Sequence, residues 1–319
     1  MRCQILPIAF DKGASVQGCA QAPHVLLAGG LMRALHEAGQ SFDVIPYNLP
    51  LFGQKRDLNS CWPQTWLDVA RVTQSLSDAA IEIADQGLPV FIGGDHSISA
   101  GSISGMARYA GRCERPFFVL WLDAHPDFHT LETTQTGNLH GVPLAYLSGQ
   151  AGFSSLFPKL ETYLCPDRIC VMGVRSVDRD EEISLARAGV EVHLMADLHR
   201  QGVQYSLMPF LEKVRQAGGL LHVSLDIDFL DPKIASGVGT PVPNGASLSQ
   251  AYQIIDLIAQ SHLLTSLDIV EYNPAFDQGH QTLAHVVDLT AHLIKAGTGY
   301  KANTGLLNKM ASLRDILPQ

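Results

Sequence analysis

The chain has 319 residues, of which 46% are hydrophobic and 17% charged, and its formal net charge is −9. This composition is that of a soluble globular protein with a large core. Acidity without a basic stripe argues against nucleic acid or a membrane surface as the main partner, and no run of about 18 apolar residues predicts a transmembrane helix.

Strands and helices are predicted to alternate along the chain, from apolar β-branched runs and from helical spacing of apolar residues. The expected strands are 3–10, 42–45, 88–92, 117–122, 168–174, 190–194, 221–225 and 263–270. The expected helices are 23–38, 65–86, one after 95, one between the fifth and sixth strands, 206–217, 247–260 and 281–295. We therefore expect a single domain over residues 1–319 with an α/β fold. Its sheet is mostly parallel, covered by helices on both faces, and open rather than closed into a barrel.

The cysteines are scattered and include no C-x-x-C pair. They are Cys3, Cys19, Cys61, Cys113, Cys165 and Cys170. We expect free, buried thiols in a reducing compartment. The first residues have only a short apolar run and lack the pattern of a signal peptide. A cytoplasmic protein is therefore expected.

The strand expected at 117–122 runs into the stretch D-A-H-P-D, residues 123–127. In an extended backbone Asp123, His125 and Asp127 would point to one face, because alternate side chains share a face. Two carboxylates and an imidazole suit a divalent metal ion of the manganese or zinc class. A strand end capped by solvated acids would explain any one of these residues alone.

Three further stretches place acids or imidazoles where an apolar strand stops. They are G-G-D-H-S (93–97), S-L-D-I-D-F-L-D-P (224–232) and D-I-V-E-Y-N-P (268–274). In open parallel sheets, sites form beyond the carboxyl ends of the strands. Four strands that end in this way predict one metal-binding pocket.

These four segments, in this order, resemble the signatures of the ureohydrolases, the family of arginases, agmatinases and formiminoglutamases. The resemblance spans nearly the whole chain. It implies a three-layer α/β/α sandwich around an eight-stranded parallel sheet, and a site with two Mn²⁺ per subunit. By this resemblance His96, Asp123, Asp127 and Asp226 would bind one ion, and His125, Asp123, Asp226 and Asp228 the other.

The resemblance also implies the reaction, hydrolysis of a guanidino group. By this resemblance the two ions would lower the pKa of a shared water, and a metal-bridging hydroxide would be the nucleophile toward the guanidinium carbon. Asp127 would accept the proton and help to transfer it to the departing amine. Glu271 would pair with the cationic guanidinium, and His140 would take the family's role of proton shuttle.

The loop 130–143 and the segment G-V-R-S-V-D (173–178) resemble those of arginases in particular. There Thr134 and Thr136 would bind the α-carboxylate of arginine, and Asp178 its α-amino group. We therefore expect a hydrolase of arginine metabolism that converts L-arginine to L-ornithine and urea. Family members are commonly trimers or hexamers, so a homo-oligomer is expected.

His129 departs from the arginase pattern, in which an Asn at this position contacts the α-carboxylate. An imidazole can also donate to a carboxylate, so we interpret His129 as a substrate-binding residue of an arginase. The alternative is a ureohydrolase for N-hydroxyarginine, agmatine or a guanidino acid.

Two alternative hypotheses for the function are a non-catalytic metal-binding protein and a single-zinc enzyme like the histone deacetylases. The complete ligand set disfavours the first, and the presence of both His96 and Asp228 disfavours the second. Asp95, Asp231 and Asp268 lie in the motifs but are not family ligands, and we expect them to orient ligands, cap helices or bind backbone amides. The histidines outside the motifs are expected to be surface or core residues. They are His24, His36, His193, His199, His222 and His262.

Overall fold

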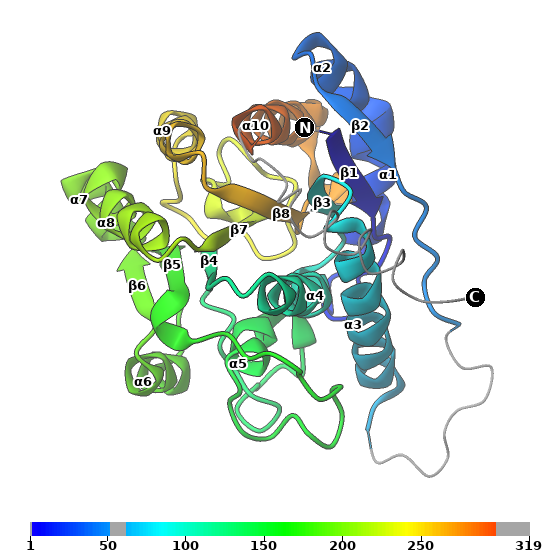
Figure 1. The fold of residues 1–319 in the computed structure, drawn as a ribbon, viewed down its shortest axis with the longest axis vertical. Helices are drawn as coiled ribbons and strands as arrows, with labels where there is room; N and C mark the ends of the chain where they lie inside the picture. Colours follow the sequence, from blue (N-terminus) through cyan, green and yellow to red (C-terminus); the bar gives the residue numbers. More distant parts are fainter. Residues whose placement is uncertain (1, 52–61, 298–319) are drawn as a thin grey trace, which may run out of the picture.

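The computed structural model describes residues 2–51 and 62–297, so Cys61 lies outside the described residues. Its centre is one open eight-stranded sheet with the order β2-β1-β3-β8-β7-β4-β5-β6, and all neighbouring strands are parallel (Figure 1). The strands are β1 Arg2–Pro7, β2 Ser41–Val44, β3 Leu88–Ile92, β4 Phe117–Leu122, β5 Ile169–Val174, β6 Glu191–Leu194, β7 Leu220–Asp226 and β8 Leu264–Val270. The predicted open, parallel α/β sheet is confirmed.

Helices cover both faces of the sheet and form the outer layers (Figure 1). One face packs against α1 Ala22–Leu26, α2 Met32–Glu37, α7 Met195–Gln201, α8 Val203–Gln216, α9 Leu248–Ser261 and α10 Gln281–Gly297. The other packs against α3 Gln64–Ile83, α4 Ser99–Arg112, α5 Pro143–Leu147 and α6 Arg179–Ala188. Strands β3, β4, β5, β7 and β8 are buried along their whole length, which accounts for their continuous apolar runs.

The strand order explains how four distant motifs meet. Strands β3, β8, β7 and β4 are consecutive neighbours in the sheet, and each of them precedes one of the four motifs. Because they are parallel, their carboxyl ends lie at the same edge. The N-terminal strands β1 and β2 lie to one side, and β2 forms an edge.

Three helical features differ from the prediction. The helix expected at 23–38 is divided into α1 and α2 by a π-helical turn, Leu27–Leu31, in which Gly30 has a φ of 124°. A left-handed glycine of this kind interrupts the regular hydrogen-bond ladder. Helices α5 and α7 were not predicted, since five and seven residues give little periodicity to recognise.

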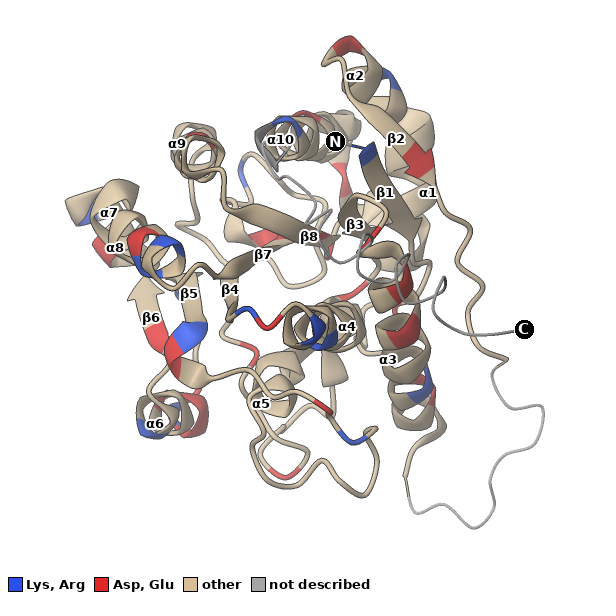
Figure 2. Ribbon diagram, in the orientation of Figure 1, with Lys and Arg blue, Asp and Glu red and all other residues tan. Residues whose placement is uncertain are grey.

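Charged residues are dispersed over the fold. Figure 2 shows Lys and Arg scattered among helices and strands and interspersed with Asp and Glu, so no basic stripe follows any one element of the described chain. None of the described helices combines the length and the apolar character needed to cross a membrane.

Candidate metal centre and substrate pocket

The D-A-H-P-D segment is not extended, so the predicted shared face is wrong. Strand β4 ends at Leu122, and the backbone bends from Asp123 onward. Asp127 has a φ of 48°, a left-handed conformation that is costly outside glycine. The turn directs Asp127 toward His96 and His125 toward Asp228. The side chains therefore divide between two groups of ligands.

The first group surrounds the imidazole of His96. Its Nδ1 atom lies 3.0 Å from Asp123 Oδ2, 3.2 Å from Asp127 Oδ2 and 3.0 Å from Asp226 Oδ2. All four side chains are buried. Nδ1 makes no hydrogen bond within the described residues. A buried nitrogen faced by three carboxylate oxygens fits a divalent cation between them.

The second group surrounds His125. Its Nδ1 atom lies 3.1 Å from Asp228 Oδ2 and 3.5 Å from Asp123 Oδ1. Asp123 thus contributes one oxygen to each group. The backbone amide of Asp228 donates to Asp226 Oδ1 at 2.7 Å, and Thr240 donates to Asp228 Oδ2 at 3.1 Å. The six ligands predicted from the motifs lie together, in two groups that share Asp123.

The electrostatics of this cluster favour bound cations. Burial and the charge of Asp123 raise the pKa of Asp127 to about 7. Burial and the charge of Asp228 raise the pKa of Asp226 well above its usual range. Burial opposes protonation of His125, but Asp228 and Asp123 outweigh it and raise its pKa to about 12. Four buried carboxylates in contact repel one another, and divalent ions would offset that repulsion.

Trp121 and Gly94 hold this cluster in place. The indole of the fully buried Trp121 stacks on His96, with ring centroids 3.9 Å apart and an interplanar angle of 6°. Its Nε1 donates to Asp123 Oδ2 at 2.9 Å. A Cβ at Gly94 would lie 1.6 Å from the carbonyl oxygen of Phe10, so only glycine allows this turn before His96.

A cavity of about 190 Å³ opens beside the ligands. The predicted residues that line it are His125, Asp127, His129, Thr134, Thr136, His140, Asp178 and Asp226. Asn138, Glu181 and Thr240 also line it and were not predicted. Glu181 lies three residues after Asp178 and accepts from its backbone amide at 3.3 Å. This three-residue spacing is that of a capping box at the start of a helix, a sequence signal that could have identified Glu181 as a neighbour of Asp178.

His140 and Glu271 form a pair next to the cavity. His140 Nδ1 lies 2.8 Å from Glu271 Oε1, which also accepts from the backbone amide of His96 at 2.8 Å. Burial opposes protonation of His140, but Glu271 outweighs it and raises the pKa to about 9. Glu271 is 1% exposed and has a φ of 64°. Its Oε2 atom accepts a hydrogen bond from the Cys19 thiol, with the sulfur at 3.6 Å. Glu271 therefore lies behind His140, and Cys19 is a neighbour that sequence reasoning missed.

Three neighbouring side chains contact the imidazole of His129. Its Nδ1 atom lies 3.2 Å from Thr133 Oγ1, and its Nε2 atom lies 3.2 Å from Glu181 Oε2 and 3.2 Å from Asp178 Oδ2. Burial opposes protonation of His129, but Glu181 and Asp178 outweigh it and raise the pKa above its usual value. A cationic imidazole at this point can attract an anionic substrate group.

The other acids of the motifs have the supporting contacts that we expected. Asp95 accepts from the backbone amides of Ser97 at 3.0 Å and Ala14 at 2.9 Å. Asp231 likewise accepts from two backbone amides, at 3.0 and 2.9 Å. Asp268 accepts from two buried serine hydroxyls, at 2.7 and 3.0 Å. Asp95 and Asp231 thereby bind loop backbone beside the candidate ligands, and Asp268 joins strand β8 to helix α4.

Comparison with known proteins identifies the family and the fold of this chain. The model of the arginase family matches residues 1–295. The arginase of Brucella melitensis is 43% identical over 296 residues, which is 92% of this chain and 96% of that relative. The native structure of the Bacillus caldovelox arginase superposes with a TM-score of 0.83 at 28% identity, covering 92% of this chain and 97% of that one. The Entamoeba histolytica arginase in complex with L-ornithine gives a TM-score of 0.81 at 28% identity, covering 92% and 98%.

Proposed function

The chain belongs to the arginase family of hydrolases that act on guanidino groups, and on this premise we propose that it hydrolyses L-arginine to L-ornithine and urea. One observation carries the proposal. A polar cavity of about 190 Å³ adjoins two groups of metal-type ligands, in a chain 43% identical to the Brucella melitensis arginase. The solved Entamoeba histolytica arginase, whose complex contains L-ornithine, supports ornithine as the product.

We propose that two Mn²⁺ ions bind the ligands around His96 and His125. Carboxylate oxygens outnumber imidazole nitrogens in both groups, which suits manganese. Such ions would supply a water of lowered pKa as the nucleophile. Asp127 would accept the proton of that water, because it both approaches His96 and lines the cavity.

The guanidino end of the substrate would meet His140 and Glu271. Among its described neighbours, the Glu271 carboxylate is held by His140, the His96 amide and Cys19. A carboxylate held by the His96 amide can pair with a cationic guanidinium through a charge-assisted hydrogen bond. His140, whose pKa is raised by Glu271, would carry the proton toward the leaving amine.

The amino acid end of the substrate would meet the far side of the cavity. Thr134 and Thr136 offer hydroxyls, and His129 offers a positive charge, for the α-carboxylate. Asp178 would bind the α-amino group. The Thr134 hydroxyl accepts a hydrogen bond from the backbone amide of Gly137, and the Thr136 hydroxyl accepts one from that of Asn138, both at 3.2 Å. These bonds limit the rotamers of the two threonines.

Urea release from matched substrates tests this proposal. The protein is loaded with Mn²⁺ and assayed with L-arginine, agmatine and 4-guanidinobutyrate, which differ in their α-carboxylate and α-amino groups. Arginine should have the highest kcat/KM. Equal or higher values for agmatine would exclude a role of the carboxylate-binding side of the cavity.

A second candidate is a ureohydrolase for another guanidino acid. The contact between His129 and Asp178 favours it. With arginine as the substrate, Asp178 would have to bind both this imidazole and the α-amino group. A substrate that has a carboxylate but no α-amino group would leave this contact intact. The same assay decides, since 4-guanidinobutyrate would then exceed arginine in kcat/KM.

We also propose a single domain over residues 1–319, a cytoplasmic location and a trimeric or hexameric assembly. Both halves of the chain contribute strands to one sheet, which supports the single domain. The proposed location rests on the scattered cysteines, which have no C-x-x-C pair, and the proposed assembly rests on the family resemblance. Light scattering of the purified protein would test the assembly directly.

A further inference from the structure

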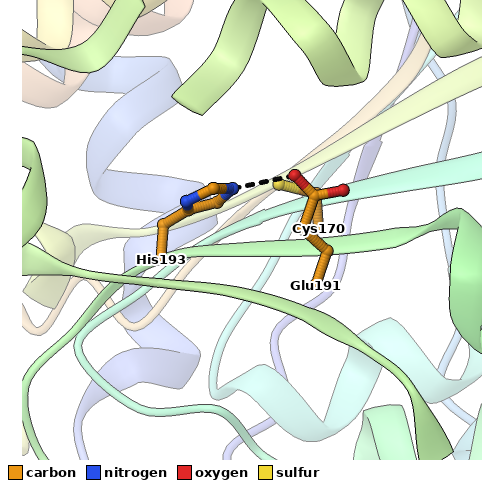
Figure 3. A group of neighbouring side chains, drawn as sticks. All are labelled: Cys170, Glu191 and His193. Atoms are coloured by element: carbon orange, nitrogen blue, oxygen red, sulfur yellow. Dashed lines mark hydrogen bonds and ion pairs between the residues drawn. The ribbon is translucent and has the colours of Figure 1, made fainter. Parts of the chain in front are cut away.

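A second kind of ligand group lies on strands β5 and β6, away from the loops that carry the candidate metal centre. It consists of Cys170, Glu191 and His193, and we call it the β5–β6 cluster (Figure 3). The sulfur, one carboxylate oxygen and one imidazole nitrogen all lie within 4.8 Å of one another. Within the described ranges 2–51 and 62–297, several groups of three possible metal ligands occur, and this is the only one that contains a cysteine.

Strand register brings the three side chains to one face. Cys170 is the partner of Glu191 across the β5–β6 pair, and His193 follows two residues after Glu191. Partners in a sheet, and residues two apart on a strand, point the same way. Figure 3 shows the imidazole directed at the carboxylate with the thiol beside them. The arrangement is therefore fixed by backbone pairing and does not depend on a loop.

The chemistry of the three donors matches a zinc-class ion. His193 Nε2 lies 2.8 Å from Glu191 Oε1, and Cys170 is fully buried beneath them. Thiolate, imidazole and carboxylate are the three side-chain ligands that zinc takes. Zinc–ligand bonds of roughly 2.0–2.3 Å put donor atoms about 3.5 Å apart, so a small rotation closes the cluster around an ion. The His193 and Glu191 side chains are 23% and 35% exposed, which leaves a path for an ion and a position for water.

Charge also favours a bound cation. A thiophilic ion would displace the proton of the buried Cys170 thiol into solvent, and the resulting thiolate would be a ligand of the ion. One thiolate and one carboxylate would offset the two charges of the ion. Mn²⁺, which prefers oxygen ligands, would compete poorly here.

We propose that Cys170, Glu191 and His193 form a separate site for a divalent zinc-class ion, which links edge strand β6 to β5. Strand β6 has four residues and pairs with β5 alone among the described strands. A short edge strand of this kind opens easily. An ion that binds only the paired strands would stabilise the pairing. The inference does not depend on the proposed reaction.

Thiolate-to-cobalt charge transfer is the test, because the candidate metal centre contains oxygen and nitrogen ligands only. The Mn²⁺-loaded protein is titrated with Co²⁺ in excess Mn²⁺, and the near-ultraviolet charge-transfer band is recorded. We expect the band in the wild type and its loss in Cys170→Ser. In His193→Gln and Glu191→Gln, cobalt should bind at least about tenfold more weakly.

Cys113→Ser and Cys19→Ser are the matched controls. Cys113 is half-buried outside any such group, and Cys19 contacts Glu271 near the candidate metal centre. A band that survives Cys170→Ser, or that disappears in Cys19→Ser instead, would overturn the proposal. If Cys170→Ser does not fold, unchanged cobalt affinity in the His193 and Glu191 variants would overturn it equally.

Hydrogen exchange tests the link between the strands. Zn²⁺ added to the Mn²⁺-loaded protein should slow amide exchange in β6 of the wild type and leave it unchanged in His193→Gln. Equal exchange in both proteins would contradict the link. Urea release provides a separate readout, because none of the three residues lines the cavity. Failure of the proposed function would leave the cobalt and exchange results unaffected.

Discussion

The Nε2 atom of His96 lies 2.9 Å from the hydroxyl of Ser224, on the side of the ring opposite the candidate ligands. The Ser224 hydroxyl lies 3.5 Å from that of Ser99, which donates to Asp268 at 2.7 Å. A proton on Nε2, donated to Ser224, leaves the lone pair on Nδ1 facing Asp226 and its neighbours. A buried polar chain thus selects the tautomer that can bind a metal ion.

We predict that Ser224→Ala lowers the affinity of the first metal position about 10- to 100-fold, because the imidazole loses its orienting partner. Competition with a chelator measures the affinity. Ser104→Ala is the matched control, since Ser104 is also buried but contacts Ser77 at 2.9 Å. Wild-type affinity in a folded Ser224→Ala protein would show that the contact has no orienting role.

We predict that Asp228→Ala reduces the bound Mn²⁺ from two ions per chain to one. Asp228 contacts His125 at 3.1 Å and belongs only to the second ligand group. Asp231→Asn lies in the same sequence segment but bonds backbone amides, so it should retain both ions. Metal analysis after gel filtration gives the count. Two ions, or none, in a folded Asp228→Ala protein would contradict the assignment.

We predict that His129→Ala raises the KM for L-arginine about tenfold and changes kcat less than about twofold, because alanine, unlike the Asn of the arginase pattern, offers no donor to the α-carboxylate. Removal of the cation leaves Asp178 and Glu181 unpaired beside the carboxylate position, and a charge-assisted hydrogen bond is worth roughly 1.5–3 kcal/mol. The KM for agmatine, which has no carboxylate, should not rise. An equal increase for both substrates would exclude carboxylate recognition. His36→Ala, an exposed change on α2, serves as the control.

We predict a pH-dependent contribution of the His140–Glu271 pair to the stability of the metal-free protein. The folded pKa of His140, about 9, exceeds the ordinary value of 6.5. The stabilisation is therefore complete below about pH 6.5 and is lost as the pH rises through about 9. The shift corresponds to an upper limit on the order of 3 kcal/mol.

Denaturant unfolding of wild type and His140→Asn at about pH 6 and pH 10 measures this contribution. The difference in free energy of unfolding between the two proteins should shrink at the higher pH. A difference that stays constant with pH would mean that the pair is not ionised in the folded protein. Glu271→Gln should reproduce the effect, because it removes the partner charge.

We predict that Gly94→Ala destabilises the fold by about 3 kcal/mol or more, because its Cβ would lie 1.6 Å from a backbone oxygen of Phe10. Gly111→Ala, in helix α4, meets its nearest atom at 3.5 Å and should be neutral or stabilising by up to about 1 kcal/mol. Thermal unfolding compares the two variants. Similar melting temperatures would show that the backbone at Gly94 can relax.

Much of the fold could be predicted because buried parallel strands are continuous apolar runs. Strands 88–92 and 117–122 have the predicted bounds in the structure. Short helices such as α5 and the π-turn around Gly30 could not be predicted, because each depends on local backbone geometry and packing with little periodicity in the sequence.

Strand alternation predicted the wrong arrangement for the candidate ligands, whereas the family resemblance grouped Asp127 with His96 and Asp228 with His125, as in the structure. Alternation in D-A-H-P-D predicted one shared face for the three side chains. In the structure Asp127 is left-handed and its carboxylate lies beside His96, whereas His125 lies beside Asp228. Backbone conformation after a strand is decided by neighbouring loops, and these come from distant parts of the chain.

Hydrophobic runs and ligand chemistry are local properties, so the amino-acid pattern was enough to predict which strands are buried and which of them end in carboxylates and imidazoles. The tertiary structure alone decided which of these groups touch. It places Ser224 behind His96, pairs His129 with Asp178, and puts Cys170 beside His193. These contacts follow from strand order and register, which are properties of the packed sheet as a whole.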